Sequence, residues 1–111
     1  SYMSPEQFVG DAVDRRSDIY SLGCVIFETL VGAPPFLEQS FEELRHAHLN
    51  TLPPSLEAPT GIYFPLSIQA IIAKCLEKKP DHRYQSAAEL AADLELALAK
   101  KPLQYALEHF K

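Results

Sequence analysis

The sequence of 111 residues has few cysteines, few glycines and no tryptophan, and these shortages narrow what the chain can be. Cys24 and Cys75 are too few for a disulfide framework or a zinc site, and they fit a reducing compartment such as the cytoplasm. The four glycines lie far apart, so none belongs to a glycine-rich phosphate-binding loop. The N-terminus lacks the pattern of a signal peptide and does not start with Met, so we expect the chain to be part of a longer protein.

The net charge argues against two kinds of partner, and the length of the hydrophobic runs argues against a membrane-spanning helix. The chain has 15 acidic and 10 basic residues, and its net charge of -5 argues against contact with nucleic acid or an anionic membrane. The most apolar run, residues 19–31, is too short to cross a bilayer and contains Glu28. Hydrophobic residues make up 47% of the chain, so we expect a globular domain, or part of one, with a modest core.

The hydrophobic periodicity is helical almost everywhere, and no strand or hairpin pattern is present, which predicts an all-α fold. Three serines stand where N-caps are expected, and two of them have Glu three residues later, as in a capping box. We expect irregular structure over residues 8–16 and 51–66. The expected helices are a short one from Ser4, one over residues 17–31, one from Ser40, one over 67–77, one from Ser86 and one over 103–110.

The helix expected over residues 17–31 has apolar residues all round and ends at Gly32, a residue suited to a left-handed stop. A helix of this kind needs cover on every side, so we expect it to be central. Its acidic residue Asp18 lies near the N-terminus, where the helix dipole favours a negative charge.

Four short motifs stand in order along the chain. Residues 2–6, Tyr-Met-Ser-Pro-Glu, are similar to the Ala-Pro-Glu end of the activation segment in serine/threonine kinases. Ser4 stands for the usual Ala, and Tyr20 stands for the usual Trp of the second motif. The other three motifs are similar to D-x-W-S-x-G, to G-x-x-P-F and to the late C-L-x-x-x-P-x-x-R pattern, and they lie at residues 18–23, 32–36 and 75–84. The resemblance covers residues 1–98, and residues 86–94 look especially like bacterial kinases of the eukaryotic type.

This resemblance implies the lower, helical half of the C-terminal lobe of a serine/threonine protein kinase whose complete fold is α+β. Residues 1–98 would belong to the catalytic domain and residues 99–111 would form a helical extension. The parent would use ATP and Mg²⁺ on a protein substrate. The chain lacks the Gly-rich loop, the strand lysine, H-R-D and D-F-G, so it would hold no catalytic, cofactor or metal residue and would be inactive alone.

The resemblance also assigns structural roles to named residues. Glu6 and Arg83 would form a buried ion pair that ties the activation segment to the lower helices, whereas sequence spacing alone would leave both as solvated charges. Asp18 would accept backbone N–H bonds from the catalytic loop, besides its plain role at a helix start. Tyr2, Met3 and Ser4 would end the loop that positions the substrate peptide. Simple apolar packing of Tyr2 and Met3 is the alternative.

The remaining ionisable residues indicate no separate site. His46 and His48 are two apart on a helix and cannot chelate a metal as a pair, so we expect all four histidines, His82 and His109 included, to be packed or solvated. From the sequence alone, we expect residues 14–16, Asp-Arg-Arg, to form a solvated loop. The resemblance implies instead that Arg16 lines the large lobe.

Two other functions remain open from the sequence. The chain could be a non-catalytic helical interaction module derived from a kinase, or a helix-turn-helix DNA binder. Its acidic charge and the lack of a basic recognition helix count against DNA binding. If the kinase interpretation is correct, its partners are a protein substrate and the rest of the kinase domain.

Overall fold

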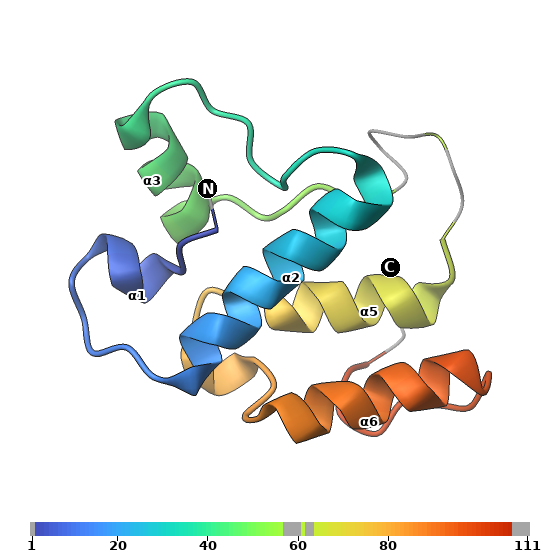
Figure 1. Ribbon diagram of the computed structural model, residues 1–111. Coiled ribbons are helices and arrows are strands. Elements are labelled where there is room, and N and C mark those ends of the chain that lie inside the picture. The colour runs from blue at the N-terminus through green and yellow to red at the C-terminus, as the bar shows by residue number, and fades with distance from the viewer. Residues whose placement is uncertain (1, 57–60, 62–63, 108–111) are drawn as a thin grey trace.

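The computed structural model describes residues 2–56, 61 and 64–107, and this part of the chain contains helices and no strand, which confirms the all-α prediction. Figure 1 shows the arrangement of the helices. The elements are α1 (Pro5–Phe8), α2 (Arg15–Val31), α3 (Phe41–Asn50), α5 (Leu66–Cys75), the 3-10 turn η1 (Pro80–His82) and α6 (Ala87–Leu98).

Helix α2 starts two residues earlier than predicted, because Asp14 is its N-cap and accepts a hydrogen bond from the backbone N of Arg16 at 2.8 Å. The expected loop over residues 8–16 was therefore wrong at both ends, because Phe8 belongs to α1 and Arg15 and Arg16 belong to α2. The helix ends where predicted, at Gly32, whose φ of 91° is left-handed and suits a residue without a side chain.

Helices α3 and α6 start at the predicted caps. The hydroxyl of Ser40 accepts from the backbone N of Glu43 at 3.1 Å, and the hydroxyl of Ser86 accepts from the backbone N of Glu89 at 3.2 Å. Each cap pairs one of the backbone donors that a helix start leaves without an intrahelical acceptor.

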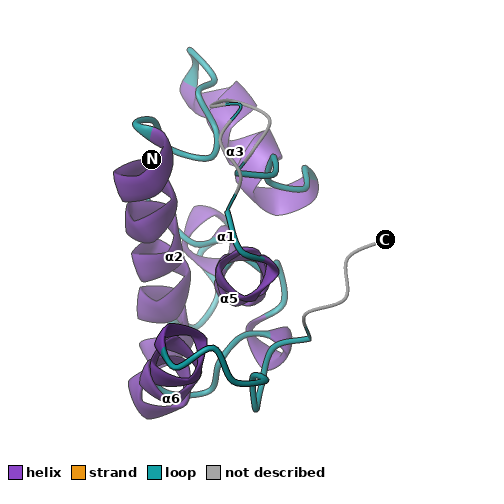
Figure 2. Cartoon of the chain, turned by 90° about the vertical axis from the view of Figure 1, so that its right-hand side faces the viewer, coloured by secondary structure: helices purple, strands orange, loops and turns teal. Residues whose placement is uncertain are grey.

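Helix α5 is the centre of the packing, since it lies against both α2 and α6 (Figures 1 and 2). The crossing with α2 is close at Gly23, where an added Cβ would lie 2.6 Å from the Cβ of Cys75. One apolar cluster joins α5 to α6 around Ile71 and Leu90, and a second joins α5 to α2 around Phe27 and Ile72. Both cysteines are buried and free.

The predicted cover on every side of α2 is only partly present. Its inner residues, Tyr20 and Phe27 among them, are buried, but Leu22, Val25 and Leu30 are each about 40% exposed. Among the described residues, one apolar face of the central helix is thus open to solvent.

The last helix predicted, over residues 103–110, is absent from its described part, because residues 103–107 are irregular; residues 108–110 lie outside the described residues. The reason is Asp93, which is fully buried in the middle of α6. Its carboxylate accepts from the backbone N atoms of Gln104 at 2.8 Å, Tyr105 at 3.2 Å and Ala106 at 2.9 Å, and from the hydroxyl of Tyr84 at 2.8 Å. These bonds hold residues 104–106 as a strap against α6 and take up amides that a helix would use.

Candidate anchor and substrate-positioning site

The structure brings Glu6 and Arg83, which are 77 positions apart, into a buried ion pair. The pair is bidentate: Nη1 of Arg83 donates to Oε2 of Glu6 at 2.7 Å, and Nη2 donates to Oε1 at 2.8 Å. The Arg83 side chain is fully buried and that of Glu6 is 8% exposed. The hydroxyl of Ser17 also donates to Oε2, so α1, the start of α2 and the residue after η1 meet at one carboxylate.

Arg83 is also bonded to the backbone of two neighbouring segments. Its Nε donates to the carbonyl of Glu77 at 2.7 Å, Nη2 donates to the carbonyl of Lys78 at 3.1 Å, and Nη1 donates to that of Arg16 at 3.0 Å. Its guanidinium lies 4.9 Å from the centre of the Tyr20 ring. All five N–H donors of the guanidinium are therefore used, which lysine could not reproduce.

Burial alone would raise the pKa of Glu6, since it penalises the charged form. The hydrogen bonds from Arg83 and Ser17 outweigh this effect and lower the pKa from 4.5 to about 2. The carboxylate is therefore charged at neutral pH, and the pair is a true ion pair.

The structure keeps Asp18 apart from this pair. Asp18 lies in the first turn of α2, as the dipole argument predicts, and its side chain is exposed. No hydrogen bond to its carboxylate is present within the described part of the chain, so its surroundings agree with an acid at a helix start.

The N-terminal segment is pinned to α2 at two points. The carbonyl of Tyr2 accepts from the hydroxyl of Ser21 at 2.6 Å, and the hydroxyl of Tyr2 donates to Glu28. The hydrogen bond to Glu28 raises the pKa of Tyr2. Tyr2 and Met3 are about 40% exposed, so both present surface next to α2.

Ser4, grouped with Tyr2 and Met3 in the sequence prediction, is placed differently. It is fully buried as the N-cap of α1, and its backbone N and hydroxyl both donate to Oε1 of Gln7, at 2.8 and 3.1 Å. Its side chain fixes the turn before Glu6 and presents no surface to solvent.

A second link between the same elements was missed, because residues 14–16 read as a solvated loop. Arg16 forms ion pairs with Asp14 at 2.8 Å and with Asp81 of η1 at 2.6 Å. The start of α2 and η1 accordingly lie side by side at the lower left of Figure 1. The contact with Asp81 has no sequence signal, since Asp81 is 65 positions away. Ser17, Ser21 and Glu28 were missed because their partners Glu6 and Tyr2 are also distant in the sequence.

The histidines are packed or solvated where they are described. His48 is fully buried against the rings of Phe8 and Phe36, and its Nδ1 lies 2.8 Å from the hydroxyl of Tyr20. The side chain of His82 is 58% exposed. His109 lies outside the described residues.

The described residues do not fit ATP or Mg²⁺. They contain no group of three His, Cys, Asp or Glu side chains that could hold a metal ion, and their glycines are isolated. No helix in residues 2–56 or 64–107 is long and apolar enough to cross a membrane.

The geometry defines a helical lobe in which a short N-terminal segment is anchored to the last helices through one carboxylate and one arginine. The model of the protein kinase domain family matches residues 1–94, and the chain belongs to this family. The resemblance inferred from the four motifs is thereby confirmed.

Bacterial serine/threonine kinases are among its relatives. The serine/threonine-protein kinase PknB of Mycobacterium leprae is 47% identical over 95 residues, and the match covers 84% of this chain and 15% of the relative. PknB of Mycobacterium tuberculosis is 46% identical over 95 residues with the same coverage. A probable serine/threonine-protein kinase of Streptomyces coelicolor is 41% identical over 105 residues, 92% of this chain and 15% of the relative. The chain thus spans about 15% of the length of these relatives.

Proposed function

We propose that this chain is the lower, helical part of the C-terminal lobe of a serine/threonine protein kinase, which transfers the γ-phosphoryl group of ATP to serine or threonine of a protein substrate. The family match and the kinase relatives support this proposal. The observation that carries it is the buried, bidentate Glu6–Arg83 pair, which joins the ends of two kinase-like motifs.

In this proposal the chain contributes positioning and not the chemistry. ATP and Mg²⁺ belong to parts of the parent that the chain lacks, because phosphoryl transfer needs a nucleotide cradle, a metal site and a residue that orients the attacking hydroxyl. The Glu6–Arg83 pair fixes the end of the activation segment on α2 and η1. Tyr2, held by Ser21 and Glu28, and its neighbour Met3 form the surface beside which the substrate peptide lies. The parent acts in the cytoplasm, in line with two free, buried cysteines.

Asp18 has a second role in the proposed parent. Its exposed carboxylate accepts backbone N–H bonds from the catalytic loop of the complete domain and holds that loop in place. Asp18→Asn in the whole protein should reduce kcat strongly and leave the KM for ATP nearly unchanged, because the nucleotide site itself is untouched. Unaltered turnover would show that Asp18 is only an acid at the start of a helix.

The test of the main proposal is phosphoryl transfer from Mg-ATP to a protein substrate, measured with the whole protein and with the 111-residue chain. We expect turnover by the whole protein and none by the chain, and calorimetry should detect no saturable binding of Mg-ATP to the chain below about millimolar concentration. The alternative function is a non-catalytic, kinase-derived interaction module. A whole protein that neither binds Mg-ATP nor transfers phosphate would favour this module and reject the proposal.

A further inference from the structure

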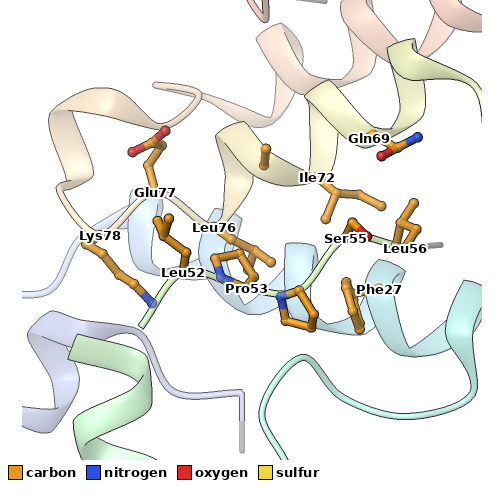
Figure 3. Close-up of a pocket in the computed structure, with 12 residues that line it drawn as sticks. Phe27, Leu52, Pro53, Ser55, Leu56, Gln69, Ile72, Leu76, Glu77 and Lys78 are labelled. Carbon is orange, nitrogen blue, oxygen red and sulfur yellow. The ribbon is translucent and has the colours of Figure 1, made fainter. Parts of the chain in front are cut away.

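A pocket of about 340 Å³ opens between α2, α5 and the segment that follows α3 (Figure 3). Its inner wall is formed by Phe27 of α2, by Ile72 of α5 and by Leu56 and Leu76, all of which are buried side chains of the core. The walls are therefore fixed by the packing of the helices. The volume lies in the range of small-molecule sites in proteins.

The outer wall is also apolar, for a reason visible in the sequence. Pro53 and Pro54 follow each other here, and proline has no backbone N–H, so this stretch offers the pocket few backbone donors. The neighbouring Leu52 is 83% exposed and extends the apolar surface. A ligand in this pocket would be held along most of its length by hydrocarbon contacts.

One end of the pocket is cationic. Lys78 lies there, half-buried, with its Nζ 3.2 Å from the carbonyl of Ala47 and 4.7 Å from the centre of the Phe36 ring. Ala47 is the only hydrogen-bond acceptor of this ammonium among the described residues, so two of its three donors remain for a ligand. The adjacent Glu77 also lines the pocket, but its side chain turns away from Lys78 in Figure 3 and lies 4.0 Å from His82.

We propose that this pocket binds a small amphiphilic carboxylate, with the apolar body against Phe27, Ile72 and Leu76 and the carboxylate on Lys78. The charge at the pocket end decides this ligand class, because a half-buried ammonium favours an anion and penalises a second cation. The site is separate from the Tyr2–Met3 surface, and the proposal does not depend on phosphoryl transfer.

The affinity of a carboxylate should depend on the protonation of Lys78 and therefore on pH, whereas apolar contacts alone would give no such dependence. Burial, together with a smaller effect of the positive charge of Arg83, lowers the pKa of Lys78 from 10.5 to about 8, although Cys24 and Glu77 act in the opposite direction. A bound carboxylate stabilises the protonated form, so its affinity should be full below pH 8 and should fall as the pH rises above that value. The affinity of an uncharged ligand of equal length should not change.

The experiment compares three probes of equal chain length on the whole protein by titration calorimetry: octanoate, octan-1-ol and octylammonium. We expect octanoate to bind about fivefold more tightly than octanol, which corresponds to about 1 kcal/mol for a partly buried ion pair. Octylammonium should bind most weakly. Equal affinities, or the tightest binding by octylammonium, would overturn the proposal.

Two variants test whether the ligand binds in this pocket. Lys78→Met keeps an unbranched side chain without the charge, and it should abolish both the preference for octanoate and the fall in affinity above pH 8. Ala73→Leu fills the pocket from α5 and should abolish binding of all probes, whereas the matched change Ala91→Leu on the exposed face of α6 should have no effect. Unchanged octanoate binding by Lys78→Met or by a folded Ala73→Leu protein would refute the assignment, and Lys78→Met decides alone if Ala73→Leu does not fold.

Discussion

Replacing Arg83 with methionine would leave the Glu6 carboxylate charged, buried and without its main partner. The change also removes the donors to the carbonyls of Arg16, Glu77 and Lys78, all of which lie within 3.1 Å of the guanidinium. Breaking a buried ion pair from one side costs about 3–5 kcal/mol, against a total stability of about 5–15 kcal/mol for a domain. We therefore expect Arg83→Met to unfold at much lower urea concentration than the unaltered chain.

A double-mutant cycle separates the pair from its surroundings. Glu6→Gln alone should cost about 2 kcal/mol, because it turns hydrogen bonds between charged groups into weaker ones. The double variant should lose less than the sum of the two single changes, with a coupling of at least about 1 kcal/mol. Arg83→Lys serves as the milder variant if Arg83→Met does not fold, and we expect it to be destabilised because lysine cannot bond bidentately.

Urea unfolding followed by circular dichroism measures these free energies. Lys101→Met and Glu38→Gln are matched controls, since both residues are exposed, and each should change stability little. If the effects of Glu6→Gln and Arg83→Met were additive within about 0.5 kcal/mol, the pair would not be a coupled anchor and the reasoning would be refuted.

The pH dependence of the free energy of unfolding provides an independent check, because the direction in which stability changes with pH can be predicted. The pKa of Glu6 is lowered from 4.5 to about 2 in the folded chain, so its contribution of about 3 kcal/mol is present above pH 4.5 and is lost as the pH falls towards 2. Subtracting the Glu6→Gln profile from that of the unaltered chain isolates this contribution. In Arg83→Met this loss of stability in acid should be much smaller, because the main partner that lowers the pKa of Glu6 is gone and only the bond from Ser17 and the backbone bond still oppose the effect of burial.

Three further predictions concern other parts of the chain. The isolated chain should associate through the open face of α2, and Leu22→Lys with Val25→Lys should make it monomeric in sedimentation velocity; association that persists would assign the contact to another face. Asp93→Asn should cost about 1–3 kcal/mol and speed amide exchange at Ala106, and protection equal to that of the unaltered chain would show that the strap is held by other contacts. Asp18→Asn in the isolated chain should change the free energy of unfolding by less than about 1 kcal/mol in urea, and a larger loss would point to a buried partner.

The part of the structure that depends on local chemistry was predictable from the sequence. The caps Ser40 and Ser86 and the stop at Gly32 act within a few residues of themselves, and all three were found where their patterns placed them. The contact between Glu6 and Arg83 was also predicted, but only through the resemblance, because spacing alone left both as surface charges.

The errors arose where a distant partner decides the local structure. Residues 103–107 have helical periodicity, yet a buried carboxylate on α6 takes the amides of residues 104–106. In the same way, Arg16 looked like a loop residue because its partner Asp81 is 65 positions away. Neither partner lies in the sequence window from which a helix or loop is predicted.

The Asp93 strap has a mechanical consequence. Residues 104–106 are bonded to the middle of α6, not to its last turn near Leu98. Tension on the polypeptide beyond residue 107 would therefore reach the middle of the helix through the Asp93 carboxylate, whose bonds to neighbouring amides share the load, and through the apolar contacts of Tyr105 and Ala106 with the core. The end of α6 would be shielded from peeling, and the first event under force would be release of the strap while the helices stay packed.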